Sequence, residues 1–233
     1  MKKIITLAAL TLSILFSQHA LAQNFTVAVT NVTHGLYFTP LLVTAHPSTT
    51  HLYQPGTAAS ANLQAMAEGG AITGLSTDVT NVGADIAAAN ATPLAPGTTA
   101  TATFTATAVG NTHLSIVGML LPTNDGFVGL DALPLPTAAG VYTYYLNAYD
   151  AGTEANNELI NGGGAPGVLG IPADPGAANG TGGTGVAVTD ANTTVHIHRG
   201  SIGDTNAVAG ASDLDTTVHR WLNPVAKITV TVN

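Results

Sequence analysis

Acidic side chains lie in two short motifs at the ends of the most apolar part of the chain. Asn124-Asp125-Gly126 and the segment from Asp150 to Glu154 both read as turns that follow apolar strands. Neither motif contains a Lys or Arg, so carboxylates that converge there would repel one another unless a cation lay between them. Carboxylates and loop carbonyls are the ligands that Ca²⁺ takes in proteins. The motifs therefore favour a calcium site, and the alternative is that Asp125 and Asp150 only form Asx turns or cap exposed loops.

Two histidines lie two residues apart in His196-Ile197-His198. On a strand, this spacing places both imidazoles on one face. Such a pair binds Zn²⁺ or Cu²⁺ when further ligands are present, and His113 and His219 are the candidates for a third ligand. The alternative is that both histidines are surface or hydrogen-bonded residues beside Arg199. A transition-metal-binding protein or metalloenzyme that uses His196 and His198 is therefore the second functional hypothesis.

Other catalytic arrangements do not emerge from the sequence. Ser115 lies within an expected strand and not in a Gly-x-Ser-x-Gly turn, and no Ser/His/Asp set has a recognisable local pattern. Gly162-Gly163-Gly164 precedes Ala-Pro and not a helix with a Lys, so no phosphate-binding loop is expected. Asp213 and Asp215 lie in a polar region and are expected to be solvated, with an auxiliary cation site as the alternative. We therefore expect no enzymatic activity.

The composition excludes several classes of protein. The 233 residues include 13 Asp+Glu but only 5 Lys+Arg, which gives a formal net charge of −8. So few basic residues cannot form a nucleic-acid-binding surface. The chain has no Cys, so disulfides are excluded, and with 8% charged residues it lacks the Glu and Lys that a coiled coil needs. The 45% of hydrophobic residues can form a core, and the acids outside the two motifs are expected to serve solubility.

The N-terminal residues have the pattern of a secretory signal peptide. Lys2 and Lys3 precede the apolar stretch 4–16, and Ala20-Leu21-Ala22 is a small-x-small cleavage site. Cleavage is expected after Ala22, which leaves residues 23–233 as one secreted or periplasmic domain. No transmembrane segment is expected in this mature chain, because the only long apolar stretch is removed with the signal peptide.

Alternation of apolar and polar residues predicts several strands. The alternation is clear in residues 25–30, 99–108 and 225–232, where β-branched residues are frequent. Segments 113–121 and 141–149 are more continuously apolar and are expected to be central strands. Together these segments predict an all-β domain with an antiparallel sheet.

The sequence predicts one short helix and one long loop. Ser60 is a suitable N-cap, Leu63 and Met66 share a face, and Gly69-Gly70 ends the run. Residues 76–91 do not distinguish a weak helix from a loop. The Gly-rich segment 161–185 has no periodicity and is expected to be a long loop without helix or strand, and a linker between domains is the alternative.

Several motifs of the chain resemble the spondin N-terminal domain, which is found in F-spondin and mindin. The resemblance rests on His113–Gly129 and on Tyr149-Asp150-Ala151-Gly152-Thr153-Glu154, which is similar to the Trp-Asp-Ala-Gly-Thr-Asp segment of that family. Three further segments are similar to its bacterial branch: Phe38-Thr39-Pro40, Ala67-Glu68-Gly69 and Trp221–Ala226. The motifs span the chain that remains after signal cleavage.

The resemblance implies an eight-stranded antiparallel β-sandwich that binds one calcium ion in an extracellular matrix or adhesion protein. Carried over by motif, the calcium ligands are Asp125, Asp150 and Glu154. Two departures matter: Glu154 is one methylene longer than the Asp of the family, and Gly126 stands where the family has an aromatic residue. The implied function is an exported calcium-binding module without catalytic activity, whose partner is an extracellular protein or glycan.

Overall fold

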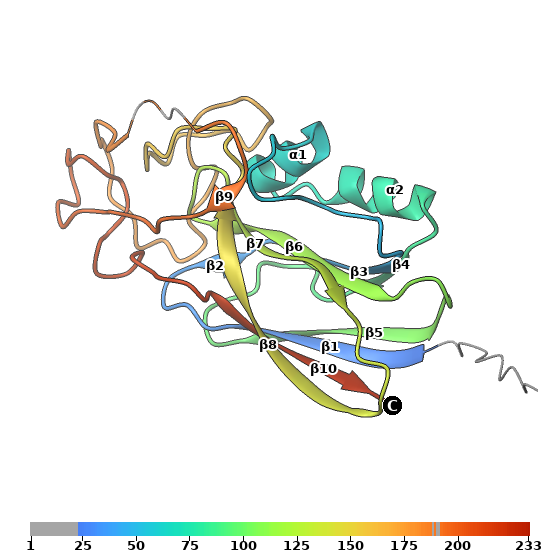
Figure 1. The fold of residues 1–233 in the computed structure, drawn as a ribbon. Coiled ribbons are helices and arrows are strands. Elements are labelled where there is room, and N and C mark those ends of the chain that lie inside the picture. Colours follow the sequence, from blue (N-terminus) through green and yellow to red (C-terminus); the bar gives the residue numbers. More distant parts are fainter. Residues whose placement is uncertain (1–22, 188, 190–191) are drawn as a thin grey trace, which may run out of the picture.

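The computed structural model describes residues 23–187, 189 and 192–233, so the expected signal peptide lies outside the described residues. This part of the chain is mostly antiparallel β-structure with two short helices (Figure 1). The strands are β1 (Gln23–Asn31), β2 (Tyr37–Phe38), β3 (Leu42–His46), β4 (Asp85–Ala88), β5 (Thr99–Thr107), β6 (His113–Leu121), β7 (Gly126–Pro134), β8 (Gly140–Asp150), β9 (His196–Ile197) and β10 (Ala226–Val232). The helices are α1 (Ala61–Gly69) and α2 (Thr73–Asn81).

Eight strands form one nearly closed sheet in the order β4-β3-β6-β7-β8-β10-β1-β5. Every pair in this order is antiparallel, as predicted, while β2 and β9 pair with β6 and β8. The sheet coils so that its edge strands β4 and β5 approach each other. The Asp85 carboxylate in β4 bridges this gap, since its Oδ2 accepts from Ala108 N at 2.8 Å and from Asn111 Nδ2 at 2.9 Å.

The alternating strands line the inside of the coiled sheet. Phe25 in β1 and Phe104 in β5 stack with their ring centroids 4.5 Å apart, and their strands are paired at these two residues. Other inward-facing positions of β1, β5 and β10 belong to the same buried cluster: Val27, Val29, Ala100, Ala102, Ala226, Ile228, Val230 and Val232. The polar positions between them face outward, so the alternation in sequence corresponds to the two faces of the sheet.

The continuous apolar run of β6 is explained by burial on both faces. β6 lies between β3 and β7, and the outer face of this part of the sheet is covered by α1 and α2 (Figure 1). Met66 of α1 and Val79 of α2 share a second buried cluster with Val117 and Met119 of β6. A strand covered on both faces has no solvent-facing positions, so no alternation remains.

The expectation of a single helix was wrong, because residues 73–81 form a second one. α1 begins as predicted, with Ser60 Oγ accepting from Leu63 N at 3.1 Å, and Gly70 closes it with a φ of 71°. α2 has no side-chain N-cap and is rich in Thr and Ser, whose hydroxyls bond back to carbonyls four residues earlier. Burial of Leu75 and Val79 against the sheet outweighs this poor helix propensity.

Long loops fill the end of the sheet near β9 (Figure 1). Segment 161–185 contains no helix and no strand, as predicted. None of the helices described is long and apolar enough to span a bilayer.

Candidate functional site

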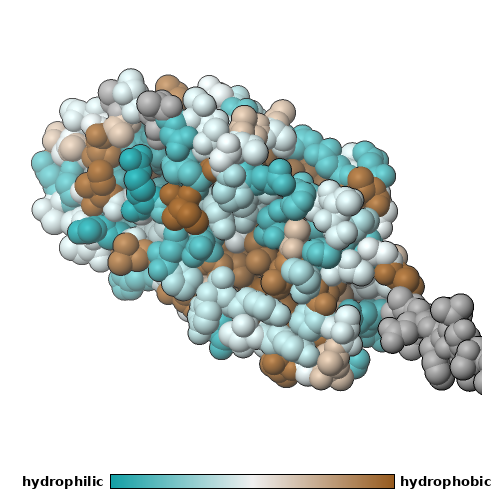
Figure 2. All heavy atoms as spheres, viewed as in Figure 1, coloured by the Kyte–Doolittle hydropathy of each residue, from teal (hydrophilic) through white to brown (hydrophobic). Residues whose placement is uncertain are grey.

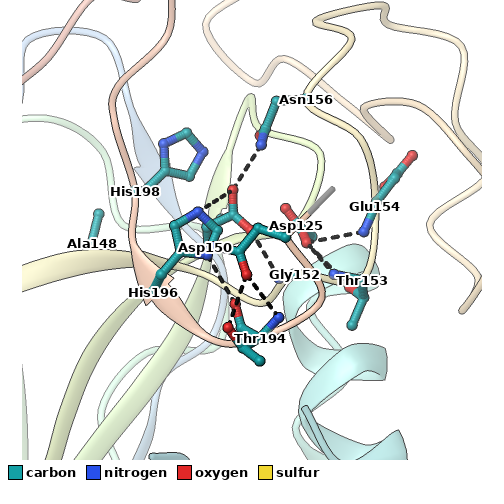
Figure 3. Close-up of polar contacts among 12 residues, drawn as sticks. Asp125, Ala148, Asp150, Gly152, Thr153, Glu154, Asn156, Thr194, His196 and His198 are labelled. Atoms are coloured by element: carbon teal, nitrogen blue, oxygen red, sulfur yellow. Dashed lines mark hydrogen bonds and ion pairs between the residues drawn. The ribbon is translucent and has the colours of Figure 1, made fainter. Parts of the chain in front are cut away.

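Sheet pairing brings the two acidic motifs together at one end of the sheet. Asp125 lies in the turn that precedes β7, and Asp150 ends β8. β7 and β8 are paired so that Gly126 lies opposite Asp150, and Ala151 N donates to the carbonyl of Asp125 at 3.2 Å. Asp125 and Asp150 are 0% and 1% exposed. Figure 3 shows their carboxylates side by side.

One carboxylate oxygen of Asp125 organises the loop after β8. Oδ2 accepts from Thr153 N at 2.8 Å, from Glu154 N at 3.1 Å and from Thr153 Oγ1 at 3.2 Å. Oδ1 is buried and has no hydrogen-bond partner among the described residues. Burial and, to a lesser degree, the nearby charge of Asp150 raise the pKa of Asp125 to about 8, although the donors on Oδ2 lower it. Asp125 therefore has one free buried oxygen and a carboxyl group that ionises with difficulty.

Both carboxylate oxygens of Asp150 accept hydrogen bonds from residues nearby in sequence. Oδ1 accepts from Gly152 N at 2.8 Å, and Oδ2 accepts from Asn156 Nδ2 at 2.7 Å. Gly152 has a φ of 68°, and a Cβ there would lie 2.6 Å from the N and O atoms of Thr194. Only glycine allows the loop to turn back at this close approach.

The third predicted ligand, Glu154, contacts a different part of the loop region. Its Oε1 accepts from Asn124 Nδ2 at 3.3 Å and from Gly170 N, while Oε2 is buried without a hydrogen-bond partner among the described residues. Burial, together with a smaller effect of the Glu68 charge, raises the pKa of Glu154 to about 7. The structure thus brings Asp125 and Asp150 together and places the Glu154 carboxylate nearer to Glu68 and Gly170.

Carboxylate oxygens such as these are ligands for a hard cation, but the three side chains do not point to a common position. Within the described residues, no group of three or more His, Asp or Glu side chains is positioned to hold a metal ion. Nevertheless, Asp125 Oδ1 and Glu154 Oε2 are buried acidic oxygens to which no described residue donates a hydrogen bond. A cation would satisfy both oxygens and relieve the repulsion between Asp125 and Asp150. The three side chains would have to turn toward one another to share it.

The two predicted histidine ligands lie next to Asp125 and Asp150 but differ in their hydrogen bonds: Nδ1 of His196 contacts a carbonyl oxygen, whereas Nδ1 of His198 accepts from a backbone N–H. His196 pairs with Asp150 across the β8–β9 ladder, with Nδ1 2.9 Å from the Thr194 carbonyl oxygen and Nε2 3.7 Å from Asp150 Oδ2. His198 Nδ1 accepts from Gly200 N at 3.0 Å, and Nε2 is buried without a hydrogen-bond partner in the described part of the chain. Burial lowers the pKa of His198 to about 4.

Gly126 lies beside His198, whereas the two candidate third histidines, His113 and His219, lie elsewhere in the structure. A Cβ on Gly126 would lie 3.1 Å from Cδ2 of His198, so the imidazole lies close beside Gly126. His113 begins β6, at the end of that strand away from Asp125. His219 is buried and lies 3.5 Å from Asp174 Oδ2 through its Nε2. Their contacts are thus with other parts of the chain than His196.

The expectation that the other acids serve solubility was wrong for several of them. Asp213 is buried, and its oxygens accept from Gly183 N at 2.9 Å and from Ile160 N at 2.8 Å. Glu158 is also buried and accepts from the backbone amides of Ile202 and Gly203. These acids connect loop segments far apart in sequence, which no local pattern reveals. Most of the other described acids outside the two motifs also accept hydrogen bonds from backbone N–H groups, several of them from residues nearby in sequence.

The loop region also contains two hollows, which do not include the acidic cluster. Their volumes are about 40 and 260 Å³. Both are lined mostly by polar and small loop residues, and Asn179, Gly180 and Asp213 line both of them. Figure 2 shows a mixed surface in which hydrophilic and apolar residues alternate over this end of the molecule.

The fold and the buried acidic cluster define a class of protein: an antiparallel β-domain whose loops at one end carry a candidate cation site. The chain belongs to the Spondin_N family, whose family model matches residues 8–158. The match includes Asp125, Asp150 and Glu154 but ends before β9 and β10. A search of curated proteins found no match. Family membership indicates an extracellular binding module.

Proposed function

We propose that the chain is an exported, non-catalytic module that binds one calcium ion through Asp125, Asp150 and Glu154. The observation that carries the proposal is the burial of Asp125 and Asp150 side by side, with Asp125 Oδ1 lacking a hydrogen-bond donor. A calcium ion would supply the positive charge that the described neighbours of these two carboxylates do not provide. Membership in the Spondin_N family supports an extracellular role in binding.

Glu154 is the proposed third ligand because one of its carboxylate oxygens, Oε2, is buried and has no hydrogen-bond partner among the described residues. Asp125 already holds the backbone N–H of Glu154 at 3.1 Å, and Glu154 Oε2 has no hydrogen-bond partner among the described residues. The longer side chain would have to turn from Gly170 toward Asp125. Calcium tolerates such variation because its coordination is flexible in number and geometry.

The surrounding residues hold Asp125 and Asp150 in place before any ion binds. Thr153 fixes Asp125 through its backbone N–H and hydroxyl, while Gly152 N and Asn156 hold Asp150. A bound ion would neutralise the carboxylates, and its binding energy would stabilise the loop after β8. We further propose that the coiled sheet forms a two-layered sandwich, which supports these loops at one end.

The proposal predicts that calcium raises the melting temperature. At a free concentration one hundred times the Kd, calcium stabilises the folded state by about 2.7 kcal/mol, which corresponds to roughly 5–10 °C for a domain of this size. Asp150→Asn removes a ligand charge and should abolish the increase. Asp78→Asn is the matched control, because Asp78 is exposed and contacts Asn62 outside the cluster. Identical melting curves for the wild-type protein with calcium and with a chelator would refute calcium binding.

Export and partner binding are tested separately. Mass spectrometry of protein secreted from the native host should give an N-terminus at Gln23, and retention of residues 1–22 would contradict cleavage.

The proposed partner is an extracellular protein or glycan in adhesion or matrix attachment. Binding of purified domain to host-surface extracts and glycan arrays should depend on calcium and be lost in Asp150→Asn. Binding that is equal with calcium and chelator would separate adhesion from the metal site.

A further inference from the structure

His196 presents a nitrogen lone pair to the acidic cluster. Its Nδ1 lies 2.9 Å from the carbonyl oxygen of Thr194. A carbonyl oxygen can only accept, so Nδ1 carries the hydrogen, and the lone pair of the neutral ring is on Nε2. Nε2 lies 3.7 Å from Asp150 Oδ2. Two electron-rich atoms thus face each other, and a proton or a metal ion between them would make the contact favourable.

The bond from His196 to the Thr194 carbonyl is typical of metal-binding histidines. A ligating imidazole usually donates its other N–H to a carbonyl or carboxylate, which fixes the ring orientation and the tautomer. Here the sheet adds a second constraint, because His196 lies opposite Asp150 in the β8–β9 pair. Residues directly opposite in a ladder have their side chains on the same face. Figure 3 shows the ring of His196 turned toward Asp150.

Asp125 supplies an independent observation that points to a ligand. It is fully buried, and Figure 3 shows its carboxylate beside that of Asp150. Its Oδ2 binds the Thr153 amide, but its Oδ1 has no hydrogen-bond partner among the described residues. Oδ1 is therefore a buried acidic oxygen that no described donor occupies.

His198 lacks the property that makes His196 suitable. The backbone N–H of Gly200 can only donate, and it lies 3.0 Å from His198 Nδ1. The lone pair of a neutral His198 ring is therefore used by Gly200, and Nε2 carries the hydrogen. A metal cannot bind this Nε2 without breaking that bond. The pattern His196-Ile197-His198 thus provides one ligand, not two.

We propose that His196, Asp150 and Asp125 form a binding site for a divalent transition-metal ion of the zinc class. One imidazole nitrogen with carboxylate oxygens is a ligand set that Zn²⁺ accepts, whereas Ca²⁺ takes oxygen ligands. The three side chains do not yet surround a common point, so the ion would draw Asp125 and His196 toward Asp150. The site shares both aspartates with the proposed calcium site but not Glu154. The two proposals therefore differ in one ligand each.

Isothermal titration calorimetry of the untagged mature chain, stripped with a chelator, tests this proposal with ZnCl₂ and CaCl₂ as separate titrants. His196→Gln should weaken zinc binding at least about tenfold and leave calcium binding unchanged. His198→Gln is the matched control and should bind zinc as the wild-type protein does. With Co²⁺ as a probe, the visible spectrum of the wild-type complex should change in His196→Gln only.

The outcomes separate the two metal proposals. Glu154→Gln should weaken calcium binding and spare zinc, and Asp150→Asn should weaken both. Unchanged zinc affinity in His196→Gln, or an equal loss in His198→Gln, would overturn the zinc proposal, as would an absence of zinc binding to the folded wild-type chain. A result with calcium binding alone refutes only the zinc site, and one with zinc binding alone refutes only the calcium site. Circular dichroism of each variant verifies that it is folded.

Discussion

Replacement of Glu158 by Gln tests whether buried carboxylates hold the loop region together. Glu158 is buried, with Oε1 accepting from Ile202 N at 2.6 Å and Oε2 accepting from Gly203 N at 2.8 Å and Ser212 Oγ at 2.7 Å. A carboxylate is suited to this position because both oxygens only accept. The amide of Gln has one acceptor oxygen, and its NH₂ group would face a backbone N–H.

The expected cost follows from the bonds that change. A hydrogen bond to a charged group contributes about 1.5–3 kcal/mol, whereas a neutral bond contributes about 1 kcal/mol. Glu158→Gln removes at least one charge-assisted bond outright and converts the others to neutral bonds. We therefore expect a loss of roughly 3–5 kcal/mol in the free energy of unfolding the loop region. This is a large part of the stability of a typical domain.

The position of Glu158 in the chain makes the effect reach the candidate site. Its backbone N–H donates to Asn124 Oδ1 at 3.2 Å, and its carbonyl accepts from Asp213 N at 2.9 Å. Asn124 is the neighbour of Asp125 in the turn before β7. Loss of the Glu158 contacts should therefore loosen both the loops around residues 202–213 and the acidic turn.

Hydrogen exchange and urea unfolding measure this prediction together. In Glu158→Gln, the amides of Ile202 and Gly203 should exchange far faster, and the first unfolding transition should shift to lower urea. Asp78→Asn removes an exposed carboxylate that accepts a hydrogen bond from the Asn62 side chain, and it should change stability by less than about 0.5 kcal/mol. If Glu158→Gln changes stability by less than about 1 kcal/mol and both amides keep their protection, carboxylates do not hold these loops.

Three further predictions concern pH and two buried positions. Because burial and Asp150 raise the pKa of Asp125 from 3.8 to about 8, the folded metal-free protein keeps a proton that the unfolded chain loses; the stability difference between the wild-type protein and Asp125→Asn, measured by urea, should fall between about pH 4 and pH 8, at up to about 1.4 kcal/mol per pH unit, and a difference that rises with pH would contradict this sign. Gly152→Ala should cost at least about 1 kcal/mol, since it places a Cβ against the Thr194 backbone at a φ of 68°; an unchanged melting temperature would contradict the predicted clash. Ser115→Ala should cost about 1–3 kcal/mol, because Ser115 Oγ lies 2.7 Å from buried His46 Nε2; a stability loss below about 0.5 kcal/mol would show that this bond is unimportant.

The strands were predictable where one face is wet. β1, β5 and β10 agree with the alternating segments 25–30, 99–108 and 225–232 to within a few residues. Alternation survives there because their outer faces meet solvent, and the period of two therefore remains in the sequence. β4 was not predicted, since it is a short edge strand of four residues that depends on pairing with β3.

The position of the candidate site was predictable, but its contacts were not. The turn before β7 and the end of β8 could be placed at one end of an antiparallel sheet from strand order alone. The direction of Glu154 depends on Asn124 and on the Gly170 amide, which comes from a loop without local pattern. The tautomers of His196 and His198 likewise depend on the backbone atoms of Thr194 and Gly200. Such contacts follow from the tertiary structure and not from spacing.

The acidic residues show why a cation is expected at one place and not at others. Most described acids accept at least one backbone N–H: Glu68, Asp85, Asp125, Asp131, Asp150, Glu154, Glu158, Asp174, Asp204, Asp213 and Asp215. In Glu158 and Asp213 both oxygens have donors, so the charge is fully solvated by the protein. Asp125 and Glu154 each keep one buried oxygen without a donor among the described residues. The metal ion proposed above would bind at these two oxygens, whereas without it burial favours the protonated forms of both carboxyl groups.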